Sequence, residues 1–258
     1  MGLLEIRGLS KNFGGIWAVS HLDFEVNSGE ILGLIGPNGA GKTTVFNLIT
    51  GVFPCTRGKV IFKGEDVTGL KPFTMARKGV VRTFQLTALF ESKTVLENML
   101  ISLHLRARSG FWAAMFDSKA TKASEAEMLR RSLELLDFLG LSHVKEHVSS
   151  SLPHGYQRLL GIAMALAASP QLLLLDEPVT GMNPEETLHA MDLIKTIRDR
   201  GTSILLVEHD MRAVMGLCDR IVVLNFGKKI AEGSVDEIGQ NEEVIAAYLG
   251  VRRNVAEH

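Results

Sequence analysis

The chain has 258 residues, of which 46% are hydrophobic and 22% charged, so it is long enough for one large domain or two small subdomains with a substantial core. A net charge of -1 gives no electrostatic case for nucleic-acid binding, which a basic face would favour. No apolar run approaches the roughly 20 residues of a membrane span, no signal peptide is recognisable, and the two cysteines follow no metal or redox spacing. We expect a cytoplasmic globular protein that binds no nucleic acid.

The first part of the chain alternates short apolar runs with turn residues. This pattern predicts antiparallel strands before residue 30, followed by a buried strand at 30–35. A helix is predicted over 42–50, where Gly51 closes it, and a further strand over 58–62.

Between the buried strand and this helix lies a glycine-rich turn with the spacing G-x-x-x-x-G-K-[ST]. It reads Gly36-Pro37-Asn38-Gly39-Ala40-Gly41-Lys42-Thr43-Thr44. Gly39 and Gly41 let the backbone curl so that its N–H groups point inward, and the helix start adds further donors. Lys42 can reach the β- and γ-phosphates of a nucleotide, and the Thr43 hydroxyl can bind Mg²⁺. The turn therefore predicts a site for ATP or GTP with Mg²⁺; the alternative is a purely structural turn.

In residues 86–169 the hydrophobic period changes from two to about 3.6. Thr94 and Glu97 form a capping-box pattern that opens a helix to about residue 106. A second helix is predicted over 120–139, with its apolar stripe at Leu129, Leu133 and Leu136. The aromatic segment between the two helices either folds into this helical lobe or forms a docking surface for a partner.

The last third returns to alternating strands and helices. Strands are predicted over 172–175 and 203–207, a helix over 184–200, and a hairpin from 220–224 and 228–231. Such alternation predicts a mostly parallel sheet covered by helices, which gives an α/β fold class.

Two carboxylates, Asp176 and Glu177, follow the apolar strand at 172–175. One can hold Mg²⁺ and the other can orient or deprotonate an attacking water, so we assign Asp176 to the metal and Glu177 to the base. Gln85 lies where the core gives way to the helical lobe and can bind Mg²⁺ or the water. His209 follows a strand expected beside that of Asp176 and can reach the γ-phosphate. Taken alone, a glutamine such as Gln85 is usually a solvated surface residue, and a histidine such as His209 is more often an ordinary loop residue.

The order of these motifs resembles that of the ATP-binding cassette (ABC) ATPases over essentially the whole chain. The residues that carry the resemblance are Phe13, the phosphate loop, Gln85, the segment Leu152-Pro153-His154-Gly155-Tyr156-Gln157, Asp176-Glu177 and His209. Within that superfamily, residues 79–85, 89–90, 94–98, 181–184, 230–233 and 247–250 resemble the importer ATPases for branched-chain, hydrophobic amino acids. The ATPases of urea and amide importers look much like those of the branched-chain amino acid importers.

The resemblance implies a P-loop NTPase with a RecA-like core and an antiparallel β subdomain (1–85 and 170–250), an inserted helical subdomain (86–169) and a C-terminal tail (251–258). Phe13 would stack on adenine, and His209 would be catalytic. Two cassettes would pair head to tail, so that segment 152–157 of one closes on the ATP held by Lys42 of the other. Gln85 and the helical lobe would couple the nucleotide state to membrane permease subunits.

The implied function is an ATP-hydrolysing subunit of an importer, placed on the inner face of the membrane through its permease and served indirectly by a solute-binding protein. A urea or amide importer and a soluble, non-transport ABC ATPase are the alternatives. Two positions depart from the family pattern. Asn183 stands where many cassettes carry Asp, although it also fits a helix cap. Pro153 replaces the signature serine and so removes a hydroxyl and an N–H, which His154 could replace as a donor.

Overall fold

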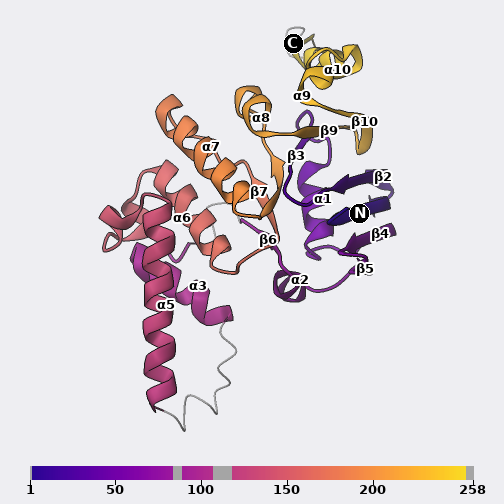
Figure 1. Ribbon diagram of the computed structural model, residues 1–258. Helices are drawn as coiled ribbons and strands as arrows, with labels where there is room; N and C mark the ends of the chain where they lie inside the picture. The colour runs from indigo at the N-terminus through magenta and orange to yellow at the C-terminus, as the bar shows by residue number, and fades with distance from the viewer. Residues whose placement is uncertain (1, 84–88, 107–117, 254–258) are drawn as a thin grey trace.

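The computed structural model describes residues 2–83, 89–106 and 118–253 (Figure 1). Gln85 and most of the aromatic segment, including Phe111, Trp112 and Phe116, lie outside the described residues. None of the described helices is long and apolar enough to cross a membrane.

The chain forms two sheets. The four-stranded sheet is antiparallel and has the order β2-β1-β4-β5; its strands are β1 (Leu4–Phe13), β2 (Ile16–Val26), β4 (Arg57–Phe62) and β5 (Glu65–Asp66). The six-stranded sheet has the order β10-β9-β3-β8-β7-β6; its strands are β3 (Ile31–Ile35), β6 (Val80–Arg82), β7 (Leu172–Asp176), β8 (Ser203–Val207), β9 (Arg220–Asn225) and β10 (Lys228–Gly233). Its pairs are parallel except for the β9–β10 hairpin. The predicted strands are confirmed.

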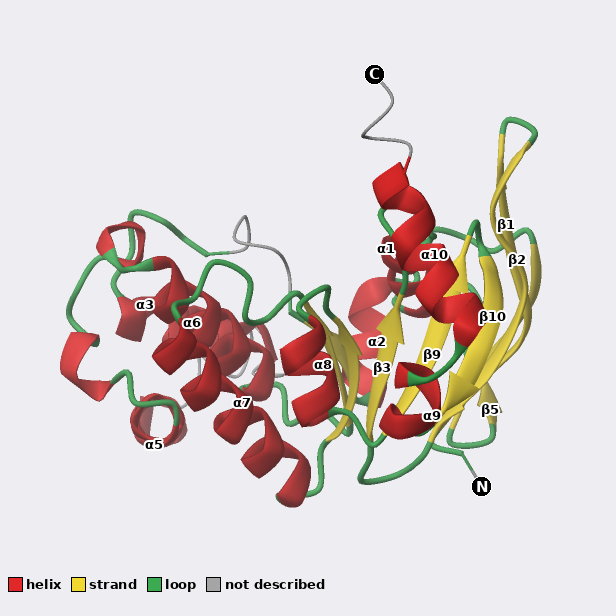
Figure 2. Cartoon of the chain, turned by 90° about the horizontal axis from the view of Figure 1, so that it is seen from above, coloured by secondary structure: helices red, strands yellow, loops and turns green. Residues whose placement is uncertain are grey.

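Helices cover both faces of the six-stranded sheet. They are α1 (Lys42–Ile49), α2 (Pro72–Lys78), α3 (Val95–Arg106), α5 (Ser118–Phe138), α6 (His154–Leu166), α7 (Pro184–Asp199), α8 (Met211–Leu217), α9 (Val235–Gly239) and α10 (Glu242–Arg253). Helices α3, α5 and α6 come between β6 and β7 in the sequence. In space they form a helical layer on the opposite side of the molecule from the four-stranded sheet (Figure 1). Figure 2 shows the same separation from above.

The six-stranded sheet separates two hydrophobic cores. Alternate side chains of its central strands point to opposite faces, so neighbouring residues belong to different cores. On β7, Leu173 and Leu175 belong to the core formed with α3, α5, α6 and α7. Leu172 and Leu174 belong to the core shared with α1 and the four-stranded sheet. Because both faces are covered, β3, β7 and β8 are buried along their whole length, which explains their continuous apolar sequences.

Local capping signals determine where two of the helices begin. The Glu97 carboxylate accepts from the Thr94 N–H at 2.8 Å, and the Thr94 hydroxyl accepts from the Glu97 N–H at 3.1 Å, so the predicted capping box of α3 is confirmed. Asn183 caps α7 in the same way, with Glu186 as its reciprocal partner. Asn183 therefore has a structural function at this helix start, whatever it contacts in an assembly.

The predicted apolar stripe of α5 is wrong at one position. Leu129 is exposed, whereas Met128, Ser132 and Leu136 are buried. The buried line runs one residue earlier at that level of the helix, and the N-terminal part of α5 projects beyond its neighbours (Figure 1). Because Met128 and Ser132 are buried at the same level, Leu129 faces away from the neighbouring helices, and a helical period alone cannot show which of two adjacent residues will face them.

The two cysteines lie in different surroundings, which gives a first prediction. Cys218 is buried, and burial raises the pKa of its thiol to about 12, whereas Cys55 is only partly buried. We expect one thiol per folded chain to react rapidly with Ellman's reagent at pH 8 and the second only after unfolding, because the thiolate is the reactive form. Cys55→Ser should abolish the rapid phase and Cys218→Ser should leave it; two rapid thiols would contradict this packing.

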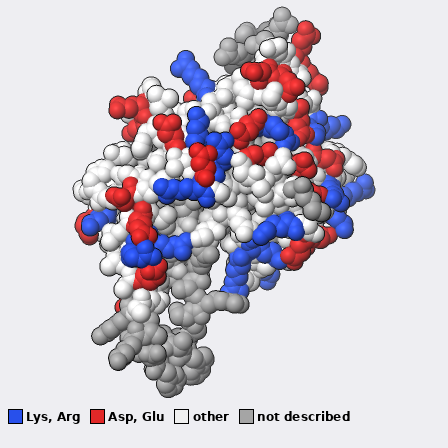
Figure 3. Space-filling view, viewed as in Figure 1, with Lys and Arg blue, Asp and Glu red and all other residues white. Residues whose placement is uncertain are grey.

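Charged side chains of both signs are interspersed over the face shown in Figure 3. Many of them form ion pairs within the chain. Arg130 pairs with Glu127 and Glu134, and Arg198 pairs with Asp199 and Asp219. Exposed pairs of this kind stabilise a fold by at most about 1 kcal/mol each, so their main effect is local neutrality.

Candidate active site

The phosphate loop connects the carboxyl end of β3 to the start of α1. Gly36, Gly39 and Gly41 have φ values of 151°, 81° and 105°, where side chains with a Cβ are disfavoured. A Cβ at Gly36 would lie 2.1 Å from the Leu224 carbonyl oxygen, and one at Gly41 would lie 2.5 Å from that of Ala18. No side chain caps α1, so the first N–H groups of the helix remain available. The loop fits a phosphate group.

Lys42 supplies a cation inside this loop. Its ammonium group donates to the carbonyl oxygens of Gly36 at 2.7 Å and Pro37 at 3.0 Å. Burial lowers the pKa of Lys42, and the negative charges of Glu177 and Asp176 oppose that shift. The amine therefore lies within the electrostatic field of both predicted carboxylates. Thr43, the next residue, is exposed at the helix start.

Asp176 ends β7 and is buried in an ion pair with Arg82 at the end of β6. An Arg82 guanidinium nitrogen lies 2.6 Å from the Asp176 carboxylate. The same guanidinium donates to the Asn47 side chain at 2.6 Å and lies 5.4 Å from the centre of the Phe46 ring. Arg82 thus connects the predicted metal ligand to α1. The sequence alone does not single out Arg82, because its pairing with Asp176 depends on the β6–β7 register.

Glu177 follows directly and has a left-handed backbone, with φ of 50°. Such a conformation costs a non-glycine residue about 1–3 kcal/mol, and it is often found at functional sites. The Glu177 N–H donates to the Val207 carbonyl oxygen at the end of β8, at 2.8 Å. The Glu177 carboxylate lies 3.6 Å from Nδ1 of His209. As expected, β8 lies beside β7, which brings these two side chains together.

Glu208 is a buried carboxylate that the sequence analysis missed. One of its oxygens accepts from the Val179 N–H at 3.1 Å. The other accepts from the N–H groups of His209 at 2.8 Å and Asp210 at 3.3 Å. Glu208 therefore holds the loop after β7 against the loop after β8. The sequence does contain a signal for Glu208: it directly follows the apolar strand at 203–207, just as Asp176 follows the apolar run at 172–175.

Phe13 ends β1 with its ring partly exposed. The ring makes an edge contact with Phe53, with 5.6 Å between centroids, and the Lys11 ammonium lies 4.9 Å from its centre. The following strand, β2, passes the phosphate loop, where the Ala18 carbonyl closely approaches Gly41. Phe13 thus lies on the hairpin that borders the loop.

The segment 152–157 lies at the start of α6, in the helical layer. Leu152 is buried, Pro153 and His154 are exposed, and Tyr156 is partly buried. A Cβ at Gly155 would lie 3.3 Å from the Glu186 carboxylate. The Gln157 side-chain amide donates to the Leu152 carbonyl oxygen at 2.8 Å, and the Gln157 backbone N–H donates to the Pro153 carbonyl oxygen at 3.1 Å.

The structure therefore brings together the phosphate loop, Asp176, Glu177 and His209, at the carboxyl ends of β3, β7 and β8. It does not bring segment 152–157 to that group within one chain. Helix α6 packs in the core on one face of the six-stranded sheet, and α1 packs in the core on the other. Figures 1 and 2 both show α6 and α1 apart.

Residues 19–180 match the ABC transporter family profile, which includes the phosphate loop and both carboxylates. The chain belongs to the ABC transporter family of ATP-binding cassettes. It is an ATPase with the α/β P-loop fold, as the motif order led us to expect. Residues 228–253, from β10 through α10, match a second profile, described as a branched-chain amino acid ATP-binding cassette transporter.

Several relatives match over nearly their whole length. The chain is 43% identical to the high-affinity branched-chain amino acid transport ATP-binding protein LivG of Salmonella typhimurium, over 96% of this chain and 98% of LivG. It is 41% identical to the corresponding protein BraF of Pseudomonas aeruginosa, with the same coverage of 96% and 98%. A nucleotide-free ATP-binding cassette from an ABC transporter superposes with a TM-score of 0.85 at 30% identity, over 96% of this chain and 99% of that one.

Proposed function

We propose that this cassette is the ATPase subunit of an importer for branched-chain or other hydrophobic amino acids. The match of residues 228–253 to the branched-chain cassette profile is the observation that carries the proposal. This segment lies outside the general ABC match at 19–180, so it supplies separate information about the subfamily. The names of the LivG and BraF relatives support the same substrate class.

The geometry supports specific functions for the residues at the carboxyl edge of the sheet. The phosphate loop and Lys42 would bind the phosphates of ATP, and Thr43 with Asp176 would hold Mg²⁺, which supplies charge neutralisation on those phosphates. Glu177 would accept a proton from the attacking water. His209, 3.6 Å from Glu177, would fix the position of that water. Phe13 would stack on adenine, and Gln85 would complete the metal site.

A second cassette would complete each ATP site. Segment 152–157 packs on the opposite side of the six-stranded sheet from α1, so it would act on the nucleotide of a partner rather than on its own. Two cassettes, identical or sister subunits, would assemble in this way beneath permease subunits on the cytoplasmic side of the membrane. A solute-binding protein would deliver the substrate to the permease.

Pro153 provides a test of the composite site. A hydrogen bond to a charged group contributes about 1.5–3 kcal/mol, so restoring the signature hydroxyl should strengthen ATP-dependent pairing by roughly 10- to 150-fold. We expect Pro153→Ser, placed in a Glu177→Gln background that blocks hydrolysis, to raise the dimer fraction with Mg-ATP in sedimentation velocity. Ser151→Ala, two residues earlier, serves as the control. An unchanged or smaller dimer fraction would show that the missing hydroxyl does not limit closure.

Transport itself is tested by uptake in cells. We expect deletion of the gene to reduce uptake of radiolabelled leucine, isoleucine and valine, and the intact chain to restore it. A Lys42→Ala variant should not restore uptake, because its phosphate loop lacks the cation that binds ATP. Uptake of urea and acetamide, measured in the same strains, separates the alternative substrates. Normal amino acid uptake in the deletion strain would reject the proposal.

A further inference from the structure

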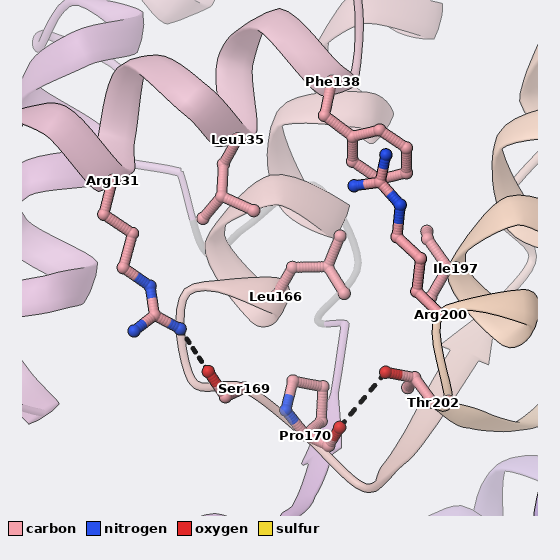
Figure 4. Close-up of a pocket in the computed structure, with 10 residues that line it drawn as sticks. Arg131, Leu135, Phe138, Leu166, Ser169, Pro170, Ile197, Arg200 and Thr202 are labelled. Carbon is pink, nitrogen blue, oxygen red and sulfur yellow. Dashed lines mark hydrogen bonds between the residues drawn. The ribbon is translucent and has the colours of Figure 1, made fainter.

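A cavity of about 340 Å³ lies at the opposite edge of the sheet from the phosphate loop. Its walls come from α5, from the turn between α6 and β7, and from the turn between α7 and β8 (Figure 4). The two turns directly precede β7 and β8, which are parallel neighbours, and Glu177 and His209 follow these strands at their other ends. The cavity is therefore separate from the nucleotide site. The cavity also lies where the helical layer meets the six-stranded sheet, because α5 lines one side of it and the turns before β7 and β8 line the other.

The floor of the cavity is apolar, and two arginines flank it. Leu135, Leu166 and Ile197 form the floor (Figure 4). Arg131 donates to the Ser169 hydroxyl, and the Arg200 guanidinium lies 3.8 Å from the centre of the Phe138 ring.

The ion pairing of these arginines differs from that of their neighbours. Arg130 and Arg198, which lie next to the cavity residues on the same two helices, are both neutralised by acidic partners. Arg131 and Arg200 form no ion pair with a carboxylate among the described residues, and no acidic side chain lines the cavity. The two positive charges thus border an apolar surface without a directly bonded carboxylate; the hydrogen bond from Arg130 lowers the pKa of Glu127, and Arg131 adds to that shift only at a distance.

We propose that this cavity binds a small organic monocarboxylate with a branched aliphatic body. The guanidinium groups suit a carboxylate, for which arginine provides paired donors, and the leucine and isoleucine side chains suit the aliphatic part. An α-ammonium group would find two cations and no carboxylate here, so the lining favours a 2-oxo acid over the corresponding amino acid. The ligand would contact α5 and the α7–β8 turn together and so stabilise their contact. This inference does not depend on the transported substrate.

Isothermal titration calorimetry of the full chain tests the proposal, with 4-methyl-2-oxopentanoate as the probe. We expect saturable binding, with weaker binding of leucine, which adds an ammonium group, and of 4-methylpentan-1-ol, which lacks the charge. Arg131→Gln and Arg200→Gln should each weaken binding by about 10-fold or more, the loss expected for a charge-assisted hydrogen bond. Arg130→Gln, one residue away on α5, is the matched control and should keep the wild-type affinity.

Two further variants make the outcome decisive. Lys42→Ala should bind the probe normally, because the phosphate loop lies at the other edge of the sheet. Arg200→Lys should bind more tightly than Arg200→Gln, which separates the loss of charge from a disturbed fold. Absence of saturable binding, equal affinity for leucine or the alcohol, or equal losses in Arg130→Gln and Arg131→Gln would each overturn the proposal.

Discussion

Replacing Glu177 with glutamine is expected to lower the rate of ATP hydrolysis by about 100-fold or more while ATP affinity stays near that of the parent. The amide keeps the size of the side chain and can still accept a hydrogen bond, but it cannot take a proton from water. The left-handed backbone of Glu177 and its bond to the Val207 carbonyl should be preserved, because both depend on the main chain.

Steady-state phosphate release and equilibrium binding of a fluorescent ATP analogue measure the two quantities separately. Glu65→Gln makes the same chemical change on β5, where the carboxylate is exposed and pairs with Lys78. That control should hydrolyse ATP at the parental rate. A Glu177→Gln protein as active as this control would remove Glu177 from the mechanism, and one that no longer binds ATP would show a structural role instead.

Replacing Arg82 with methionine is expected to lower the free energy of unfolding by about 3–5 kcal/mol, the usual cost of leaving a buried charge unpaired. The Asp176 side chain is 3% exposed and that of Arg82 10%, so water cannot replace the lost guanidinium. Asn47 would lose its donor at the same time. Urea unfolding in the absence of nucleotide measures the change.

Two comparison variants isolate the buried charge as the cause. Lys78→Met breaks the exposed Lys78–Glu65 pair and should cost at most about 1 kcal/mol. The double variant Arg82→Met with Asp176→Asn should regain part of the lost stability, because no uncompensated carboxylate remains. A loss in Arg82→Met no larger than that in Lys78→Met would mean that the Arg82–Asp176 pair does not stabilise the fold.

Arg82 and Glu208 hold neighbouring elements of the active site together through buried polar contacts, which the sequence motifs alone do not show. Arg82 connects the end of β6 to Asp176 and to α1, and Glu208 connects the loops after β7 and β8. Each satisfies groups that would otherwise be buried without partners. Both residues therefore position others in the site: Arg82 holds Asp176, and Glu208 holds the backbone of His209.

Local signals in the sequence determined the elements of this protein and much of its chemistry. The glycines of the phosphate loop, the capping residues Thr94 and Asn183, and the apolar runs of β7 and β8 act through the nearest few residues. Their consequences can therefore be read without the fold. The same is true of the strand-end position of Asp176 and Glu177.

Only the tertiary structure decided the contacts between distant residues. The Arg82–Asp176 pair, the three N–H groups on Glu208 and the exposure of Leu129 depend on strand register and on which side of a helix faces its neighbours. The packing of α6, which begins with segment 152–157, and of α1 on opposite faces of one sheet depends on how the layers stack, and so does the cavity between Arg131 and Arg200. Local sequence carries no record of such partners, because the residues meet only when the chain has folded.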